Sequence, residues 1–389
     1  MIKTINAYTL EIDYVDEAVN EILSQLDVEN NLCANSVGLL TCHADFVSSG
    51  VVKALCEKLP FPVIGSTTLS NSNSDSDDSM QLTIMMLTSD DVKFAAGLTD
   101  PFSGETSESF TSAYEKAIQE IDNKPKLGIV YTPLLNNVSG DFFVRELDKL
   151  LDGVPLFGMT TVDHNMDYHE SCVIFNGEAY ADRLVFVLLD GDISPKFHMG
   201  SLQKEKIMRE KAIVTASKAN QLYSVNDMPV LEYLKEAGII REDDGDISIT
   251  GIPFILDFCD GTMPVIRAMI AHTPDGTIIC GGDVPVGAAL TVGYMDEDIV
   301  LNSAEEMLNA MGEGEENRTT LICSCISRYV AQGFDPDREK ILVREKLYSK
   351  IQPYMLAYGG GEICVVKGEP DDGKVHNRYH NNTIAICTF

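Results

Sequence analysis

The sequence predicts a mixed α+β protein of the α/β type, with two lobes whose mixed sheets are built from repeated strand-helix-strand units and hairpins. Three observations support this fold class. The chain has 389 residues, and one hydrophobic core usually stops growing before that length, so two lobes are expected. A strand-helix-strand pattern recurs along the chain, and short Gly, Asn and Asp turns separate other apolar runs.

The repeat is clearest at the second strand of each unit, which contains a glycine near its end. Residues 37–41, 46–59 and 62–68 read as strand, helix and strand, and residues 127–131, 140–151 and 155–161 read the same way. We refer to residues 62–68 and 155–161 as the repeat exits, and both have the sequence Pro-apolar-apolar-Gly-x-Thr-Thr. A third, weaker copy covers residues 320–324, 337–351 and 355–363. Crossover units of this kind join parallel strands, so the loops after those strands should share one edge of the sheet.

Hairpin signals lie between the repeats. Residues 80–87 and 92–97 flank Ser89-Asp-Asp91, and residues 171–175 and 180–189 flank Asn176-Gly177. Three more strand candidates, at residues 254–258, 265–272 and 278–280, are joined by Gly, Pro and Asp turns and predict a meander.

The expected domains are residues 1–201, a helical connector at 202–237 and residues 238–389. The connector is rich in Lys, Glu and Ala at helical spacing. Residues 71–79 form a polar, acidic segment that lacks the turn glycine and terminal glutamate of a calcium loop, which favours a solvated loop.

The excess of acidic residues makes some classes of binding partner unfavourable. With 29 Lys+Arg against 60 Asp+Glu, the formal charge is −31, which opposes binding to nucleic acid or to an anionic membrane surface. No apolar run approaches the roughly 18 residues of a membrane helix, and no signal-peptide core follows Met1, so we expect a cytoplasmic protein. The expected partners are a small-molecule ligand and a separate output protein; a homodimer is one arrangement that the sequence leaves open.

The ten cysteines are expected to be reduced thiols. Cys172, Cys259, Cys364 and Cys387 lie in apolar runs and are interpreted as small buried residues. No CxxC pair occurs, and Cys323-Ser-Cys325 has no second pair at zinc-ligand spacing, so no metal site is predicted.

The candidate binding site lies where the strand ends should meet. Glu362 and the segment from His380 to Thr383 should come together on neighbouring strands, with Arg328 as a carboxylate clamp for a zwitterionic ligand. The full predicted ligand-binding set is Gly158, Thr160, Cys325, Arg328, Glu362, His380, Asn381, Asn382 and Thr383. The competing structural interpretation is that Glu362 pairs with Arg328 or caps backbone amides, while Asn381 and Asn382 only fix a turn.

The ending of the chain resembles the FIST C-terminal domain, through Ser324-Cys325 with Arg328, then residues 358–363 (Tyr-Gly-Gly-Gly-Glu-Ile) and residues 380–383 (His-Asn-Asn-Thr). Residues 155–158, Asp163, residues 175–177 and the strand at 182–189 leading to Gly200 are similar to the FIST N-terminal domain. The resemblance covers nearly the whole chain and implies signal transduction through sensing of small ligands, with amino acids as the usual suggestion. No output module fits in the remaining residues, so a separate partner is expected to read the signal.

Two alternatives remain open from the sequence. FIST-type proteins linked to haem and nitric oxide imply a histidine axial ligand, for which the N-terminal half offers His43, His164, His169 and His198. No cofactor is predicted in the main interpretation, which also assigns no catalytic residue. In a cysteine-dependent hydrolase the nucleophile would be Cys42 beside His43, or Cys325 with His380 as base and Glu362 or Asn382 to orient it.

Overall fold

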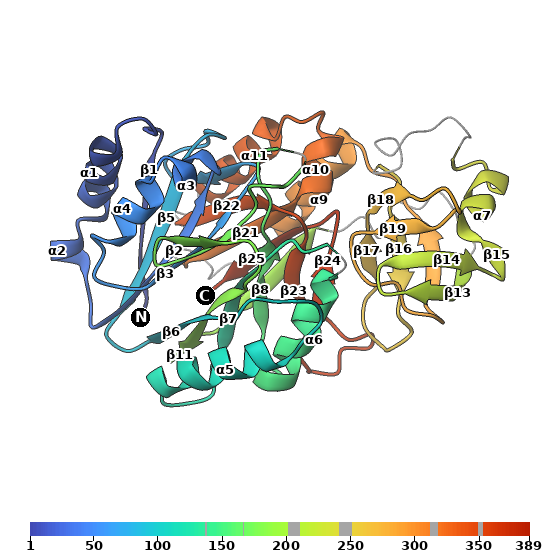
Figure 1. The fold of residues 1–389 in the computed structure, drawn as a ribbon, viewed down its shortest axis with the longest axis horizontal. Coiled ribbons are helices and arrows are strands. Elements are labelled where there is room, and N and C mark those ends of the chain that lie inside the picture. Colours follow the sequence, from blue (N-terminus) through green and yellow to red (C-terminus); the bar gives the residue numbers. More distant parts are fainter. Residues whose placement is uncertain (137, 166, 201–210, 241–250, 312–317, 349–352) are drawn as a thin grey trace.

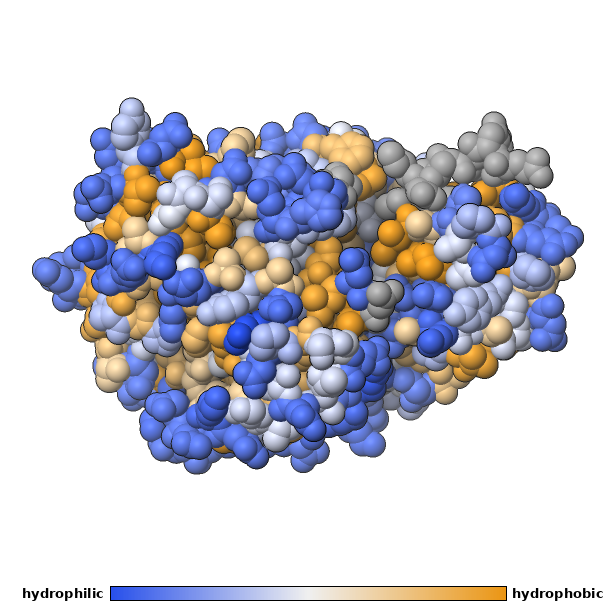
Figure 2. All heavy atoms as spheres, in the orientation of Figure 1, coloured by the Kyte–Doolittle hydropathy of each residue, from blue (hydrophilic) through white to orange (hydrophobic). Residues whose placement is uncertain are grey.

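The computed structural model describes the chain except for residues 137, 166, 201–210, 241–250, 312–317 and 349–352. Figure 1 shows a larger body and, at the right of the view, a smaller lobe that contains β13 to β20. Both termini lie in the larger body, which therefore combines the two ends of the chain. On the face shown in Figure 2, hydrophilic residues dominate the outer helices, as expected for a chain of net charge −31.

Three sheets make up the larger body, and each contains one parallel pair from the repeat. The first runs β1 (Lys3–Thr9), β5 (Leu82–Ser89), β2 (Asn35–Cys42), β3 (Val63–Thr67), β9 (Val173–Phe175) and β10 (Glu178–Tyr180). The second runs β24 (His376–His380), β23 (Glu362–Val366), β8 (Leu156–Thr160), β7 (Leu127–Thr132), β11 (Val185–Asp190) and β6 (Lys93–Leu98). The third runs β12 (Lys196–Gly200), β25 (Ile384–Thr388), β21 (Thr320–Cys325), β22 (Tyr354–Gly359) and β4 (Asn71–Asn73).

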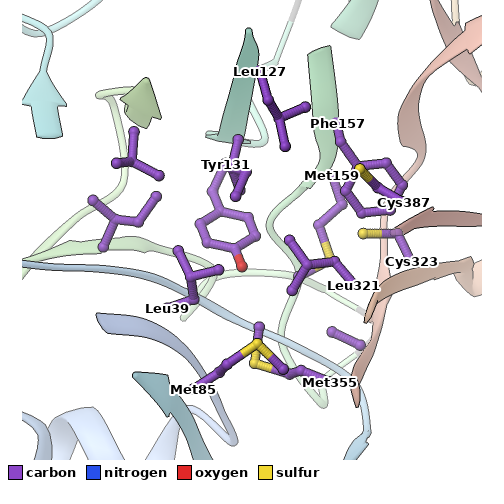
Figure 3. Packing of buried hydrophobic residues seen from close by; sticks show 14 of the residues in the cluster. Leu39, Met85, Leu127, Tyr131, Phe157, Met159, Leu321, Cys323, Met355 and Cys387 are labelled. Atoms are coloured by element: carbon purple, nitrogen blue, oxygen red, sulfur yellow. The ribbon is translucent and has the colours of Figure 1, made fainter. Parts of the chain in front are cut away.

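A shared core lies between these sheets. Alternate residues of the strands, such as Leu39, Tyr131 and Leu321, one from each sheet, pack in a single buried cluster with Met85 and Phe157 (Figure 3). Residues of the opposite alternation face helices, so these strands are apolar on both faces and read as continuous apolar runs.

Helices cover the outer face of each sheet. The first sheet carries α1 (Val15–Leu26), α2 (Val28–Asn31), α3 (Asp45–Ser48) and α4 (Val51–Cys56); the second carries α5 (Glu108–Ala117), the 3₁₀ turn η1 (Ile118–Glu120) and α6 (Gly140–Leu151); the third carries α9 (Glu297–Ala310), α10 (Ile326–Ala331) and α11 (Asp337–Tyr348). Side-chain caps begin two of them, because Ser139 accepts from Asp141 N and Asp296 accepts from Ile299 N. None of the helices within the described residues is long and apolar enough to cross a membrane.

The small lobe is an almost closed antiparallel sheet with its own core. Its strands are β17 (Val265–Arg267), β16 (Phe254–Asp257), β20 (Ala289–Val292), β13 (Ala212–Lys218), β14 (Gln221–Val225), β19 (Ile278–Cys280) and β18 (Met269–His272), with β15 (Met228–Pro229) beside β14. The helix α7 (Val230–Glu236) packs against this core.

The predicted fold class and the repeat are confirmed. β2 and β3, β7 and β8, and β21 and β22 are parallel pairs with a helical crossover. The turn at Asn176-Gly177 is confirmed, since it joins β9 and β10 and both of its residues have positive φ, as a two-residue turn requires. The second strand of this hairpin is β10 and not the predicted 180–189, because residues 185–189 of that range belong to β11, which lies in another sheet. The antiparallel pairing expected for residues 254–280 is confirmed in β16 with β17 and in β18 with β19. The predicted strand 265–272 is divided, however, because β17 and β18 stand at opposite ends of the strand order.

Four local predictions were wrong. Residues 80–97 do not form a hairpin, because β5 and β6 belong to different sheets. The helical connector at 202–237 is helical only at α7, since β13 and β14 are strands; residues 201–210 lie outside the described part. Within the supposed solvated loop, Asn71, Ser72 and Asn73 are buried and pair with β22. Cys259 is exposed, although all ten cysteines are unpaired as expected.

The body is also not divided at the predicted boundary. Strands from the first half pair with strands from the last third of the chain, namely β4 with β22, β8 with β23 and β12 with β25. Periodicity along the sequence identifies strands, but it carries no information about pairing between such distant segments.

Steric crowding explains why both repeat exits have glycine at the same position. A Cβ on Gly158 would lie 1.7 Å from the Val130 carbonyl oxygen, and one on Gly65 would lie 2.7 Å from the Leu40 carbonyl oxygen. Val130 and Leu40 are their partners in the parallel pairs. The neighbouring strand leaves no room for a side chain at either position.

Replacement of Gly158 by alanine is therefore expected to destabilise the fold by several kcal/mol, since the clash is with backbone and cannot be relieved by a rotamer change. Gly153 is the matched control, because it has φ +80° but a Cβ added there would have no neighbouring atom within 4 Å, so Gly153→Ala should cost only about 1–2 kcal/mol. Urea unfolding of both variants measures the difference. Equal losses would show that backbone conformation, not the close approach, selects glycine.

Candidate functional site

Hydrogen bonding between β23 and β24 brings the two predicted C-terminal segments together. Glu362 is directly opposite His380 in this antiparallel pair, so the two side chains lie on the same face of the sheet. Asn381, Asn382 and Thr383 form the turn that leads from β24 to β25. We refer to Glu362, His380, Asn381, Asn382 and Thr383 as the Glu362 cluster, and all five are buried.

Glu362 is the buried acid of this cluster. Thr383 Oγ1 donates to its Oε2 at 2.5 Å, whereas its Oε1 has no hydrogen-bond partner of normal geometry, the Cys325 thiol being a weak neighbour. Burial raises the pKa of Glu362 to about 8, with the Thr383 hydrogen bond and the nearby positive charge of Arg328 opposing that rise. The carboxyl group is therefore mostly protonated at neutral pH.

The other members of the Glu362 cluster also carry unpartnered polar atoms. Neither ring nitrogen of His380 makes a hydrogen bond of normal geometry, and the same holds for the Oδ1 atoms of Asn381 and Asn382. Burial and the charge of Arg267 lower the pKa of His380 to about 3, so its ring is neutral and offers one donor and one acceptor. Buried polar atoms normally find partners, so such a concentration of unpartnered ones indicates a place for a bound molecule.

Arg328 does not act as the predicted clamp. Its guanidinium is buried and bonded to Glu339 through Nε at 3.0 Å and Nη2 at 2.5 Å, with Ser303 Oγ and the Val300 carbonyl as further acceptors. The alternative in which Arg328 pairs with Glu362 is wrong for the same reason. Tyr358 and Ser324 hydroxyls complete the shell around Glu339.

The remaining predicted residues lie beside the Glu362 cluster without facing it as free groups. Gly158 and Met159 of β8 pair with Ile363 and Glu362. The Thr160 hydroxyl bonds Thr132 at 2.9 Å and the Tyr379 hydroxyl at 3.0 Å, which satisfies it within the protein.

Cys325 is near Glu362 but is not an activated nucleophile. Its Sγ lies 3.7 Å from Ser327 Oγ, and burial together with the Glu362 charge raises the pKa of the thiol. His380 makes no hydrogen bond to it among the described contacts. The dyad predicted for a hydrolase is therefore not formed in this arrangement.

Arg267 was not predicted from the sequence. This residue of the small lobe contacts the larger body next to the Glu362 cluster. Arg267 is fully buried and donates to the Tyr379 carbonyl at 2.7 Å, to Asp141 Oδ1 at 2.8 Å and to the Asp283 carbonyl at 3.0 Å. Its sequence signal is a single charge within the apolar run Val265–Met269, the kind of residue that is buried only when it is paired.

Gly281 of the small lobe allows a close contact between that lobe and the Glu362 cluster. A Cβ on Gly281 would lie 2.4 Å from Asn381 Oδ1, and Asn381 N donates to the Ile266 carbonyl at 3.3 Å. The small lobe therefore touches the turn of the Glu362 cluster directly.

A hollow of about 510 Å³ lies outside this contact. It is lined from the body by Asp141, Asn377 and Arg378 and from the small lobe by Phe258 and Asp283. A second hollow, of about 780 Å³, is bounded by β1, the start of β22 and α11, and none of the predicted site residues lines it. Within the described residues, only the first is connected to the Glu362 cluster, because Asp141, which lines it, is bonded to Arg267.

The histidines considered for haem lie elsewhere. His43 follows β2 and His164 follows β8, and their rings stack with centroids 3.7 Å apart. His169 is exposed and His198 lies in β12. Burial raises the pKa of the Cys42 thiol, and Cys172 and Cys56 add to that rise, so the Cys42–His43 pair also lacks the features of a nucleophile and base.

A pH dependence follows from the raised pKa of Glu362. The folded state binds this proton more tightly than the unfolded chain, whose glutamate pKa is near 4.5. The stabilisation is fully present below about pH 4.5 and is lost as the pH rises towards 8, with a slope of up to about 1.4 kcal/mol per pH unit. We expect the free energy of unfolding of wild type, minus that of Glu362→Gln, to fall across this window in urea titrations.

Above about pH 8 the difference should stay constant. Subtracting the variant removes the contributions of other titrating groups, including His380. Parallel stability curves from pH 5 to pH 8 would contradict a raised pKa at Glu362.

Comparison with known proteins identifies two matching domains. A family model described as the FIST N domain matches residues 36–228, and one described as the FIST C domain matches residues 230–365. The chain matches no curated protein.

Among solved structures, the cyanuric acid hydrolase from A. caulinodans is 11% identical, with a TM-score of 0.35 over 100% of this chain and 98% of that one. Another cyanuric acid hydrolase structure is 9% identical, with a TM-score of 0.29 over 76% and 99% of the two chains. Scores this low carry no argument about activity.

Proposed function

The chain belongs to the FIST family, and we propose that it is a sensory protein that binds a small ligand at the Glu362 cluster and signals to a separate partner protein. FIST domains are associated with small-ligand sensing in signal transduction. The observation that carries the proposal is the set of unpartnered buried atoms on Glu362, His380, Asn381 and Asn382. Leaving them unsatisfied costs about 1–3 kcal/mol each, and a ligand that pairs with them recovers that cost.

The chemistry of these atoms favours a ligand that donates hydrogen bonds. The amide oxygens of Asn381 and Asn382 are acceptors, and the neutral imidazole adds one acceptor and one donor. The carboxyl group of Glu362 becomes acceptor-only once it gives up the proton that it holds in the free protein. The amino group of an amino acid or a similar metabolite suits this set. With Arg328 occupied by Glu339, recognition is centred on the amino end and not on the carboxylate.

Charge balance links binding to proton release. An ammonium group next to Glu362 favours the ionised carboxylate, so binding of a cationic amine displaces the proton that Glu362 holds in the free protein. The proton passes to solvent. Affinity should rise as the pH approaches 8, for as long as the ligand amine stays protonated.

Ligand entry requires movement of the small lobe, because every residue of the cluster is buried. The contacts to be released are those of Arg267 with Tyr379 and Asp141 and the approach of Gly281 to Asn381. The hollow beside Asp141 lies on this route. We propose that closure of the lobe over ligand is the change that a partner reads.

Thermal melting of the full chain with a panel of amino acids and simple amines tests the proposal. A ligand at about one hundred times its dissociation constant should add about 2.7 kcal/mol to the stability. Glu362→Gln and Asn381→Ala should each reduce the affinity for that ligand at least about tenfold, the equivalent of one lost hydrogen bond to a buried group.

Glu369→Gln is the matched control, because Glu369 is an exposed glutamate in the segment between β23 and β24. It should leave the shift unchanged. A panel without any shift for wild type would count against the proposal, and so would a shift that survives in both cluster variants.

A further inference from the structure

We propose that His43, Asp45 and His164 form a binding site for a divalent transition-metal ion such as Zn²⁺. One potential ligand atom from each residue lies within 4.8 Å of the others. The site is separate from the Glu362 cluster, and its residues play no part in the proposed function above.

The repeat brings these three residues together. His43 follows the end of β2, Asp45 begins α3, and His164 lies a short loop beyond the end of β8. The carboxyl ends of β3 and β8 are themselves joined, because the Thr67 and Thr161 hydroxyls lie 2.9 Å apart. The loops of two repeats therefore meet at one edge, where ligands collect in sheets with parallel strands.

The distances are close to those of a coordination shell. His43 Nδ1 is 3.4 Å from Asp45 Oδ2, and donor atoms about 2.0–2.2 Å from a tetrahedral zinc ion lie roughly 3.3–3.6 Å from one another. The donor of His164 lies within 4.8 Å of the other two. Nitrogen and carboxylate donors in this number select zinc and its transition-metal neighbours over magnesium or calcium, which prefer oxygen-only sites.

Unsatisfied hydrogen bonding at the site also indicates a ligand. Nδ1 of His164 is buried without a hydrogen-bond partner, which is costly unless a metal or another group uses its lone pair. His43 Nδ1 accepts only a long 3.4 Å contact from Asp45 N. The two rings lie 26° from parallel with centroids 3.7 Å apart, so both histidines present their edges to one small region.

The surroundings supply support and access. Asp163 is fully buried and fixes the loop of His164 by accepting from the backbone of Asn165 and Glu170, each at 2.7 Å. These hydrogen bonds hold in place the backbone of the loop that carries His164. The Asp45 side chain is 44% exposed, so an ion can reach the site from solvent, and the net charge of −31 attracts cations.

Titration of the chelator-treated full chain with Zn²⁺, followed by calorimetry and thermal melting, tests the site. Wild type should bind about one equivalent and melt at a higher temperature. His164→Gln and Asp45→Asn should weaken binding at least about tenfold, in line with loss of one donor of three. Asp45→Asn keeps the test usable if the His164 variant does not fold.

His169→Gln is the control, since His169 lies in the same loop but is exposed and outside the cluster. It should bind like wild type. Co²⁺ distinguishes the donor types, because thiolate ligation by any of the ten cysteines gives a charge-transfer band that a His and Asp site lacks. Equal binding by wild type and His164→Gln, a thiolate band, or no binding by wild type would overturn the proposal.

Discussion

The close meeting of the three strand-helix-strand repeats at the ends of their parallel strands is the constraint on which the rest of the structure depends. Each junction is a hydrogen bond between two repeats. Thr67 bonds Thr161, the Gly360 amide donates to the Thr160 carbonyl at 2.9 Å, and Thr68 donates to the Tyr358 carbonyl at 2.7 Å. These contacts hold three sheets around one core, so their end loops cannot move apart independently.

The glycines of the repeat exits make this geometry possible. Any side chain at Gly158 would push β8 away from β7, and the pairing of β8 with β23 would shift with it. Glu362 is opposite Met159 in that pairing. The position of the buried acid is therefore set by a close approach that the sequence shows only as a repeated glycine.

The sequence predicted the parts of the fold that are local or repeated. The crossover units, the Asn176-Gly177 turn and the apolar strands all follow from patterns within about thirty residues. Pairing across long separations could not be predicted in the same way. The pairing of Asn71–Asn73 with β22 depends on a partner more than two hundred and eighty positions later, and polar residues gave no sign of burial.

At the candidate site, too, local features could be predicted from the sequence and long-range contacts could not. The juxtaposition of Glu362 with the turn at residues 381–383 follows from neighbouring strands, and the structure has it. The ionic partner of Arg328 could not be predicted from the sequence. No acid lies within one helical turn of Arg328 in the sequence. Glu339 reaches it from α11, because only the packing of α10, α11 and α9 brings these groups together.

Burial of that ion pair has a consequence for the ligand site. Two charges placed in the interior must pair with each other and with surrounding dipoles, and Arg328 and Glu339 use all of their polar atoms to do so. The pair therefore makes no hydrogen bond to Glu362, and burial keeps that carboxyl protonated although the charge of Arg328 opposes this. A neutral cluster beside a satisfied ion pair differs from the charged clamp that residue types alone indicated. Its unpartnered amide oxygens suit ligands that donate hydrogen bonds, and its protonated acid can give up a proton to a cationic ligand.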